Sequence, residues 1–151
     1  MTKIGIAVLN FDQTYQLQPC LKKKCYEWIE LTDARHTSSY CDMKALAVIG
    51  ERLGKRKSKG ISLLGSGNYH YVTYLFLSRI QLPFTLVLFD YHTDMLSPPC
   101  QSLMSCGSWV TTSIEKLPLL KHVVLMLSHL LILWGFEHRQ RVVENYERTG
   151  N

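Results

Sequence analysis

The sequence predicts an α/β protein in which helices cover both faces of a mainly parallel sheet. Short apolar runs of strand length alternate with segments of helical periodicity, in the order strand, helix, strand, helix, strand. The length of 151 residues suits one domain, and 46% hydrophobic with 19% charged residues is typical of a globular chain. We therefore expect a single three-layer α/β/α domain over residues 1–151, in which residues 126–151 are atypical.

The first half of the chain supplies three strands and two helices in this interpretation. Residues 3–9 predict a short buried strand, and the alternation in residues 27–31 predicts a half-buried one. Asp42 stands where a helix N-cap belongs, and apolar residues then recur at helical spacing until Gly54. Residues 61–64 predict another buried strand, and the apolar segment 69–80 predicts a mostly buried helix.

The second half begins with the longest strand signal. Phe84–Phe89 is an unbroken apolar run after Pro83, which predicts a strand buried on both faces. A helix over 109–116 and a strand over 123–127 follow, and the polar tail from Glu137 predicts a helix. Residues 123–136 are strongly apolar but fall short of the roughly 20 residues that a membrane helix needs, so we expect buried core there.

Charge and cysteine content narrow the classes of function. The net charge of +5 comes from two basic runs, Lys22–Lys24 and Lys55–Lys59, which we interpret as solvated loop or helix ends because no nucleic-acid motif accompanies them. Five cysteines without a C-x-x-C pattern argue against a disulfide framework or a structural zinc cluster. With no signal peptide in the pattern, we expect a cytoplasmic protein that binds neither membrane nor nucleic acid.

A metal site is predicted at the end of the strand 84–89. Asp90, His92 and Asp94 follow it at alternate positions, which in extended chain point to one side. Two carboxylates and an imidazole at one point require a positive charge among them, and a divalent ion would supply it. The alternative interpretation is a surface turn with a hydrogen-bonded histidine.

A second source of ligands precedes that strand. Gly65-Ser66-Gly67 ends the strand 61–64, and His70 is expected on the first turn of the next helix. If the two strands are adjacent, His70 meets the other three residues, and the predicted ligands suit manganese, with zinc or iron as alternatives. The glycine loop could instead be a plain tight turn or a phosphate cradle, but it lacks the lysine of a P-loop. The predicted metal ligands are His70, Asp90, His92 and Asp94.

These residues resemble the arginase (ureohydrolase) family, and most closely its branch of uncharacterised bacterial proteins. The resemblance covers roughly residues 1–125. It lies in the segments Gly65–Tyr71, Asp90–Asp94, Ser105–Trp109, Trp28–Leu31 and Ser39–Cys41.

The resemblance implies an arginase/deacetylase-like fold with a pair of manganese ions. His70 and Asp94 would bind one ion, His92 the other, and Asp90 would bridge them. Metal-bound hydroxide would then attack a C–N bond of a small guanidino or amide substrate.

Three departures from the family pattern limit what the resemblance implies. Tyr69 stands where arginases have an aspartate, and Ser105–Trp109 lacks the asparagine and histidine that grip arginine. No aspartate follows Asp94, so the family's later D-x-D is missing. We therefore expect an incomplete domain, the product of a truncated or frame-shifted gene, which lacks the C-terminal part of the fold.

Two other functions stay open alongside the hydrolase, and no catalytic side chain is assigned. One is a non-catalytic remnant of the fold that binds one metal or none and pairs with itself as a homo-oligomer to cover a sheet edge. The other, ranked well behind, is a basic nucleic-acid-binding module that uses the two lysine runs. Cys106 could be a nucleophile, but a buried or metal-proximal thiol is the favoured interpretation.

Overall fold

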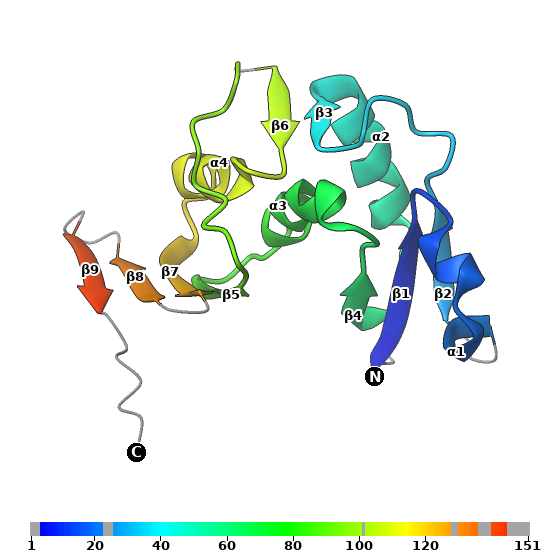
Figure 1. Cartoon of the computed structure of the whole chain (residues 1–151), viewed down its shortest axis with the longest axis horizontal. Coiled ribbons are helices and arrows are strands. Elements are labelled where there is room, and N and C mark those ends of the chain that lie inside the picture. The colour runs from blue at the N-terminus through cyan, green and yellow to red at the C-terminus, as the bar shows by residue number, and fades with distance from the viewer. Residues whose placement is uncertain (1–3, 23–25, 101, 128–129, 136–139, 145–151) are drawn as a thin grey trace. The chain divides into compact units, whose positions relative to one another are not determined.

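The computed structural model describes residues 4–22, 26–100, 102–127, 130–135 and 140–144. The chain divides into two compact units, each of which contains its own sheet (Figure 1). The first unit comprises residues 1–72 and 98–106, and the second comprises residues 73–97 and 107–151. Helices and parallel strands along the chain confirm the α/β class, while the three-layer arrangement and the single domain stay predictions.

A parallel sheet of three strands forms the centre of the first unit. Its order is β2 (Glu27–Glu30), β1 (Ile4–Asn10) and β4 (Lys59–Leu63), three strands that the sequence predicted without their order. Ala7, Val8 and Leu9 of the middle strand are at most 1% exposed. The prediction that residues 61–64 are buried is wrong for Ile61, which is 59% exposed, because β4 lies at an edge of this sheet.

Helix α2 (Met43–Gly54) confirms the helix predicted from the N-cap and the apolar spacing. The carboxylate of Asp42 accepts a hydrogen bond from the backbone N–H of Ala45 at 2.8 Å, which satisfies one of the orphan donors of the first turn. Leu46, Ile49 and Leu53 form the buried stripe of this helix.

Two other features of the first unit were not predicted. Strand β3 (Tyr40–Asp42) pairs antiparallel with β6 (Leu103–Ser105), so two three-residue segments about 60 positions apart form a ladder. Segments this short carry no periodicity that sequence could reveal. The short helices η1 (Thr14–Leu17) and α1 (Pro19–Lys22) follow β1.

The single helix predicted over residues 69–80 is wrong. The structure has a 3₁₀ helix, η2 (Gly67–Val72), followed by a short α-helix, α3 (Thr73–Leu77). In a 3₁₀ helix, residues i and i+3 eclipse, which puts Tyr69 and Val72 on one side. Both are buried, together with Tyr71. His70 therefore lies in a 3₁₀ turn, and not on the first turn of an α-helix as expected.

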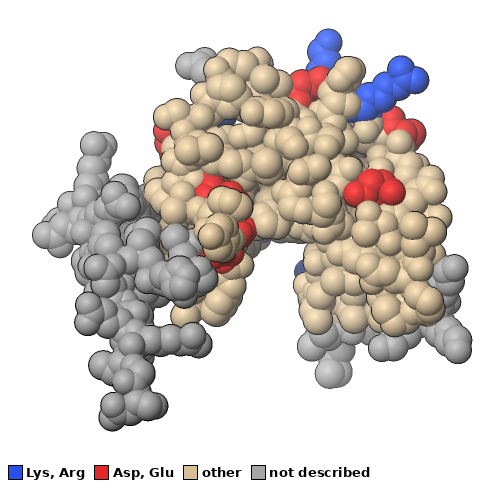
Figure 2. Space-filling model, viewed as in Figure 1, with Lys and Arg blue, Asp and Glu red and all other residues tan. Residues whose placement is uncertain are grey.

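The basic run Lys55–Lys59 follows the end of α2 and is held there by an ion pair and hydrogen bonds. Lys55 pairs with Glu51 at 2.8 Å, and the Glu27 carboxylate accepts hydrogen bonds from the backbone N–H groups of Lys57 and Ser58. Hydrogen bonds from Ser58 and Lys57 lower the pKa of Glu27. On the face that Figure 2 shows, acidic side chains lie close to the few Lys and Arg side chains. These contacts are those of a helix end that is exposed to solvent, as the sequence predicted for this run. That the protein does not bind nucleic acid stays a prediction.

Replacing Arg52 with methionine is expected to raise the pKa of Asp33. The Arg52 guanidinium donates to the Asp33 carboxylate at 2.6 Å and to the carbonyl of Glu30 at 2.7 Å, and it holds the pKa of Asp33 at about 2. A carboxyl whose pKa is lower in the folded state than in the unfolded state stabilises the fold at pH values above its unfolded pKa of about 4. This stabilisation is lost as the pH falls towards 2. In R52M, an NMR titration should therefore find the Asp33 pKa near its ordinary value.

The variant Lys55→Met serves as the control for this experiment. It removes a cation from the same helix, but Lys55 pairs with Glu51 and not with Asp33. The Asp33 pKa should therefore stay near its wild-type value in K55M. An unchanged Asp33 pKa in R52M would show that the guanidinium is not the cause.

The second unit contains a mixed sheet. Strand β5 (Phe84–Phe89) pairs parallel with β7 (Leu120–Leu127), and β8 (Leu130–Gly135) and β9 (Gln140–Glu144) continue the sheet antiparallel. Helix α4 (Trp109–Lys116) has the bounds that the sequence predicted. The sheet is therefore parallel on one side only, whereas the prediction was for a mainly parallel sheet.

Two predictions for the second unit are wrong. Strand β5 is not buried on both faces: burial alternates along it, with Val87 at 49% and Phe89 at 73% exposure, because one face of the strand is left uncovered. Residues 140–144 of the tail form a strand and not a helix, and the rest of the tail from 145 lies outside the described residues. Within the described ranges, no helix is long and apolar enough to cross a membrane.

Candidate metal centre

The predicted metal motif begins directly after β5, and its first carboxylate is held by its own backbone. One oxygen of Asp90, Oδ1, accepts hydrogen bonds from the N–H groups of Tyr91 at 2.6 Å and His92 at 3.2 Å. Such a local side-chain turn directs the carboxylate toward the backbone of the residues that follow it. It also breaks the extended conformation at the point where the strand ends.

The second carboxylate of the motif is buried and held from another element. Asp94 is 8% exposed, and its Oδ2 accepts a hydrogen bond from the indole N–H of Trp109 at 2.7 Å. Its carbonyl oxygen accepts another from the N–H of Val110 at 3.2 Å, so both ends of the residue are attached to the start of α4. Its φ of 50° lies in the left-handed region, which costs energy for a residue other than glycine.

Asp90 and Asp94 thus bring two carboxylates together within the second unit. One oxygen of each lies within 4.8 Å of the other. Two negative charges at this separation repel, and the repulsion is strong where one of them is shielded from water. A divalent cation would relieve that repulsion, which is the charge pattern of a metal site.

His92 is placed differently from the prediction. Its side chain is 76% exposed, its Nδ1 lies 3.9 Å from Oδ1 of Asp90, and its ring meets Tyr91 edge to face with centroids 5.2 Å apart. The prediction assumed extended chain through Asp94, in which alternate residues point to one side. The turn at Asp90 and the left-handed Asp94 remove that alternation, so His92 and Asp94 do not share a side by strand geometry.

The histidine upstream lies in a segment that the first unit fixes firmly. Gly65 has a φ of 91°, and its N–H donates to the Tyr15 hydroxyl at 3.0 Å. Tyr69 stacks on Phe11 with ring centroids 4.2 Å apart. A Cβ on Gly67 would lie 3.9 Å from the imidazole of His70, so the backbone there runs beside the ring. The glycine loop is therefore a turn that these contacts fix in place, and it carries a half-buried histidine.

Because His70 belongs to the first unit, the predicted ligands that the structure brings together are Asp90 and Asp94 of the second unit. The strands that precede these residues, β4 and β5, belong to different sheets and do not pair, whereas the sequence interpretation relied on their adjacency. Tyr69 occupies the position where the resemblance expects an aspartate, and its side chain is 6% exposed in the stack with Phe11.

The segment 105–109 contributes a residue that the sequence interpretation missed. Trp109 was noted only as part of the Ser105–Trp109 resemblance, yet its N–H holds Asp94. A tryptophan at the start of a helix that follows a metal motif was the available signal, since a buried indole N–H needs an acceptor. Cys106 is a half-buried free thiol whose N–H donates to the carbonyl of Ser39, which supports a structural role for this segment.

Comparisons with known proteins do not establish a family. No protein-family model and no solved structure matches this chain. An uncharacterized protein of Thermotoga maritima is 35% identical to it over 65 residues, a stretch that covers 43% of this chain. The matched stretch spans only 26% of that relative's length.

Proposed function

We propose that this chain carries the metal-binding part of a metal-dependent hydrolase of the arginase-like class. The observation that carries the proposal is the buried Asp94 carboxylate within 4.8 Å of a second carboxylate, Asp90. The resemblance adds His70 as the proposed imidazole ligand. Such a costly arrangement is maintained where a cation binds.

The donor set fits a divalent ion of borderline hardness. Two carboxylates and one imidazole suit manganese, and zinc or iron could bind the same donors. When bound, the ion would supply a Lewis acid that lowers the pKa of water and makes a nucleophile near neutral pH. The protein's own part is to hold the ligands: Trp109 fixes one oxygen of Asp94, and two backbone N–H groups fix one oxygen of Asp90.

The proposed substrate is a small guanidino or amide compound with a hydrolysable C–N bond. This class follows from the resemblance of Gly65–Tyr71, Asp90–Asp94 and Ser105–Trp109 to the arginase family. Arginine itself is not proposed, because the segment 105–109 has neither asparagine nor histidine. The cytoplasmic setting and a homo-oligomer belong to the same proposal.

The alternative is a protein that binds one metal ion and does not catalyse hydrolysis. Asp90, Asp94 and His70 would provide donors for one ion, and the D-x-D that the resemblance expects for a second ion does not occur within these 151 residues. One ion without turnover is the distinguishing result, whereas a pair of ions with hydrolysis supports the enzyme.

A manganese titration of wild type, His70→Ala and His92→Ala tests the proposal. We expect H70A to weaken binding by at least about tenfold, because it removes a ligand, while H92A stays within about twofold. Equal losses in both variants would show that His92 is a ligand, as the resemblance implies. A wild-type protein that takes up no ion under manganese saturation would contradict the proposed function altogether.

A further inference from the structure

Strand β5 is an outer strand of the sheet in the second unit, and only one of its edges has a neighbour in that sheet. The sheet order is β5, β7, β8 and β9. The N–H of Phe84 donates to the carbonyl of Leu119, beside the start of β7, at 2.9 Å. Successive backbone groups of a strand point to opposite edges, so those of Thr85, Val87 and Phe89 point away from β7. This edge therefore offers donors and acceptors to another strand.

Strand β5 lacks the charged residues that the other outer strands of the two larger sheets contain. No residue of Phe84–Phe89 is charged, and Pro83 lies before the strand. In the first unit, the outer strands β2 and β4 contain Glu27 and Lys59. At the far end of the second sheet, β9 contains Arg141. Charges on edge strands oppose pairing with other chains, so β5 is the outer strand at which such pairing is least opposed.

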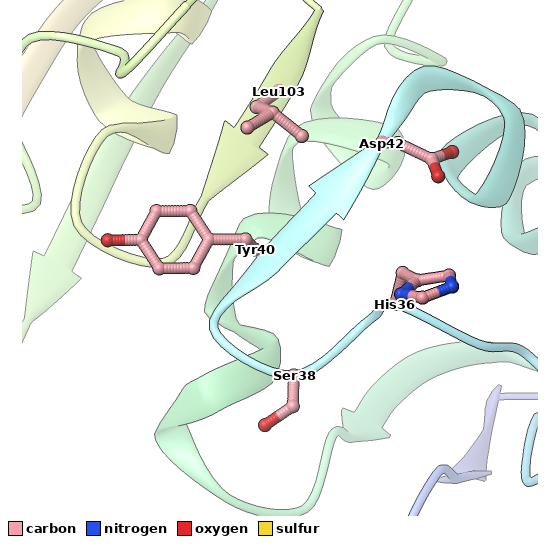
Figure 3. Close-up of a pocket in the computed structure, with 5 residues that line it drawn as sticks. All are labelled: His36, Ser38, Tyr40, Asp42 and Leu103. Atoms are coloured by element: carbon pink, nitrogen blue, oxygen red, sulfur yellow. The ribbon is translucent and has the colours of Figure 1, made fainter.

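The short ladder of β3 and β6 is a poorer candidate for binding. Each strand has three residues, and β3 ends in Asp42. In Figure 3 the side chains of Asp42 and His36 project to one side of β3, whereas the ring of Tyr40 extends to the other. These side chains and Ser38 line a cavity of about 380 Å³, but the Ser38 hydroxyl accepts a hydrogen bond from Asn68 at 3.2 Å. The cavity therefore does not direct its polar groups to one ligand.

The exposed side chains of β5 lie on one face of its sheet and are mostly apolar. Thr85, Val87 and Phe89 alternate with less exposed residues, and Val87 is 49% and Phe89 73% exposed. On β7, Met126 is the register partner of Phe89 and is 42% exposed. A strand added at the open edge would place its own side chains beside this apolar surface, so backbone pairing and apolar contact would occur together.

A second copy of β5 fits this edge in antiparallel orientation. A two-fold axis at Val87 places that residue opposite the second copy's Val87, and Thr85 opposite its Phe89. All three residues direct their backbone groups to the open edge, so each opposing pair would exchange two hydrogen bonds. An aromatic ring beside a β-branched residue is a favourable cross-strand pair. Asp90 would lie opposite the second copy's Phe84, which keeps the two Asp90 carboxylates about 20 Å apart.

We propose that two copies of this chain pair through β5, antiparallel about a two-fold axis at Val87, and so join their four-stranded sheets. The proposal rests on the homo-oligomer included in the proposed function and names its interface. It uses no ligand of the candidate metal centre, so manganese titration and the measurement of association test the two proposals separately.

Sedimentation equilibrium of the full chain is the first test. We expect a dimer whose population rises with protein concentration, as mass action requires. Hydrogen exchange followed by NMR should show that the amides of Thr85, Val87 and Phe89 become protected as the dimer forms. A protein that stays monomeric would overturn the proposal, and so would a dimer in which these amides exchange as fast as in the monomer.

Substitutions at the two-fold axis test the register. Val87→Lys should raise the dimer dissociation constant by at least about tenfold, because it places two like charges directly opposite each other. Val48→Lys is the matched control, since Val48 is a valine of α2 in the first unit with a similar exposure of 42%, and it should leave the dimer unchanged. Circular dichroism checks that both variants are folded, and the manganese affinity of V87K should equal that of wild type.

A charge-reversal experiment separates this interface from general charge repulsion. Val87→Glu should weaken the dimer as V87K does, and a mixture of V87K with V87E should associate more tightly than either variant alone, because opposite charges then meet at the axis. Equal weakening in V87K and V48K would contradict an interface at β5. A mixture that associates no better than its components would contradict a two-fold axis at Val87.

Discussion

Replacing Asp94 with asparagine is expected to abolish manganese binding while the fold is retained. The change removes one of two carboxylates in the group that could hold an ion, and we expect the affinity to fall by at least about a hundredfold. The asparagine side-chain oxygen can still accept the hydrogen bond from Trp109, so the packing around α4 should survive. Calorimetric titration with manganese gives the affinity, and a thermal melt by circular dichroism gives the stability.

Asp12→Asn is the matched control for this variant. Asp12 is exposed, and its carboxylate accepts the N–H of Thr14, a bond that asparagine also makes. The charge change is the same as in D94N, and manganese binding should stay at the wild-type value. A D94N protein that binds manganese as tightly as wild type would mean that Asp94 is not a ligand.

Removing the charge at Asp94 should also change the stability of the metal-free protein and its response to manganese. If the two carboxylates repel in the absence of metal, D94N should be at least as stable as the metal-free wild type, because an uncharged amide relieves the repulsion. Added manganese should then stabilise wild type and not D94N, since a ligand stabilises only the state that binds it. A stability gain in both proteins would indicate binding elsewhere on the chain.

Local signals in the sequence were sufficient for several elements of this fold. The N-cap at Asp42 and the apolar spacing predicted α2, and α4 was predicted over about the residues that it occupies. Strands β1 and β5 were predicted from their apolar runs. These features depend on residues that are near one another in the chain, so periodicity and capping reveal them.

What the sequence could not provide depends on contacts between distant segments. The β3–β6 ladder joins Cys41 to Met104, and nothing local in either segment predicts a strand. The exposure of Phe89 depends on which elements cover β5, and an apolar run alone predicts burial on both faces.

The candidate site was predicted in part. The motif Asp90–Asp94 and His70 were identified from the sequence by residue type, and the structure brings Asp90 and Asp94 together within the second unit. His92 was included by extending strand alternation past Phe89; a side-chain turn at Asp90 ends that alternation, and the role of His92 as a ligand stays a prediction. Trp109 was missed as a partner of Asp94 because the indole and the carboxylate are 15 positions apart, and only the start of α4 brings them together.

Replacing Trp109 with alanine is expected to lower the free energy of unfolding by about 3–5 kcal/mol. The indole is 1% exposed, and its loss creates a cavity at the start of α4 and removes the hydrogen bond from its N–H to Asp94. Urea unfolding followed by circular dichroism measures the change. Tyr91→Ala removes an aromatic ring that is 73% exposed, and should change the stability by less than about 0.5 kcal/mol.

Trp109→Phe separates the packing of this residue from its effect on the metal ligand. Phenylalanine keeps an aromatic ring in the core but has no N–H, so Asp94 loses the bond that holds its Oδ2. We expect a smaller loss of stability than in W109A, together with a manganese affinity lowered by about tenfold. If W109F binds manganese within about twofold of wild type, the indole hydrogen bond does not position Asp94, and Trp109 contributes to the fold alone. If the affinity falls while the fold is retained, the buried indole is a positioning residue, and the left-handed turn at Asp94 is held for the ion that it binds.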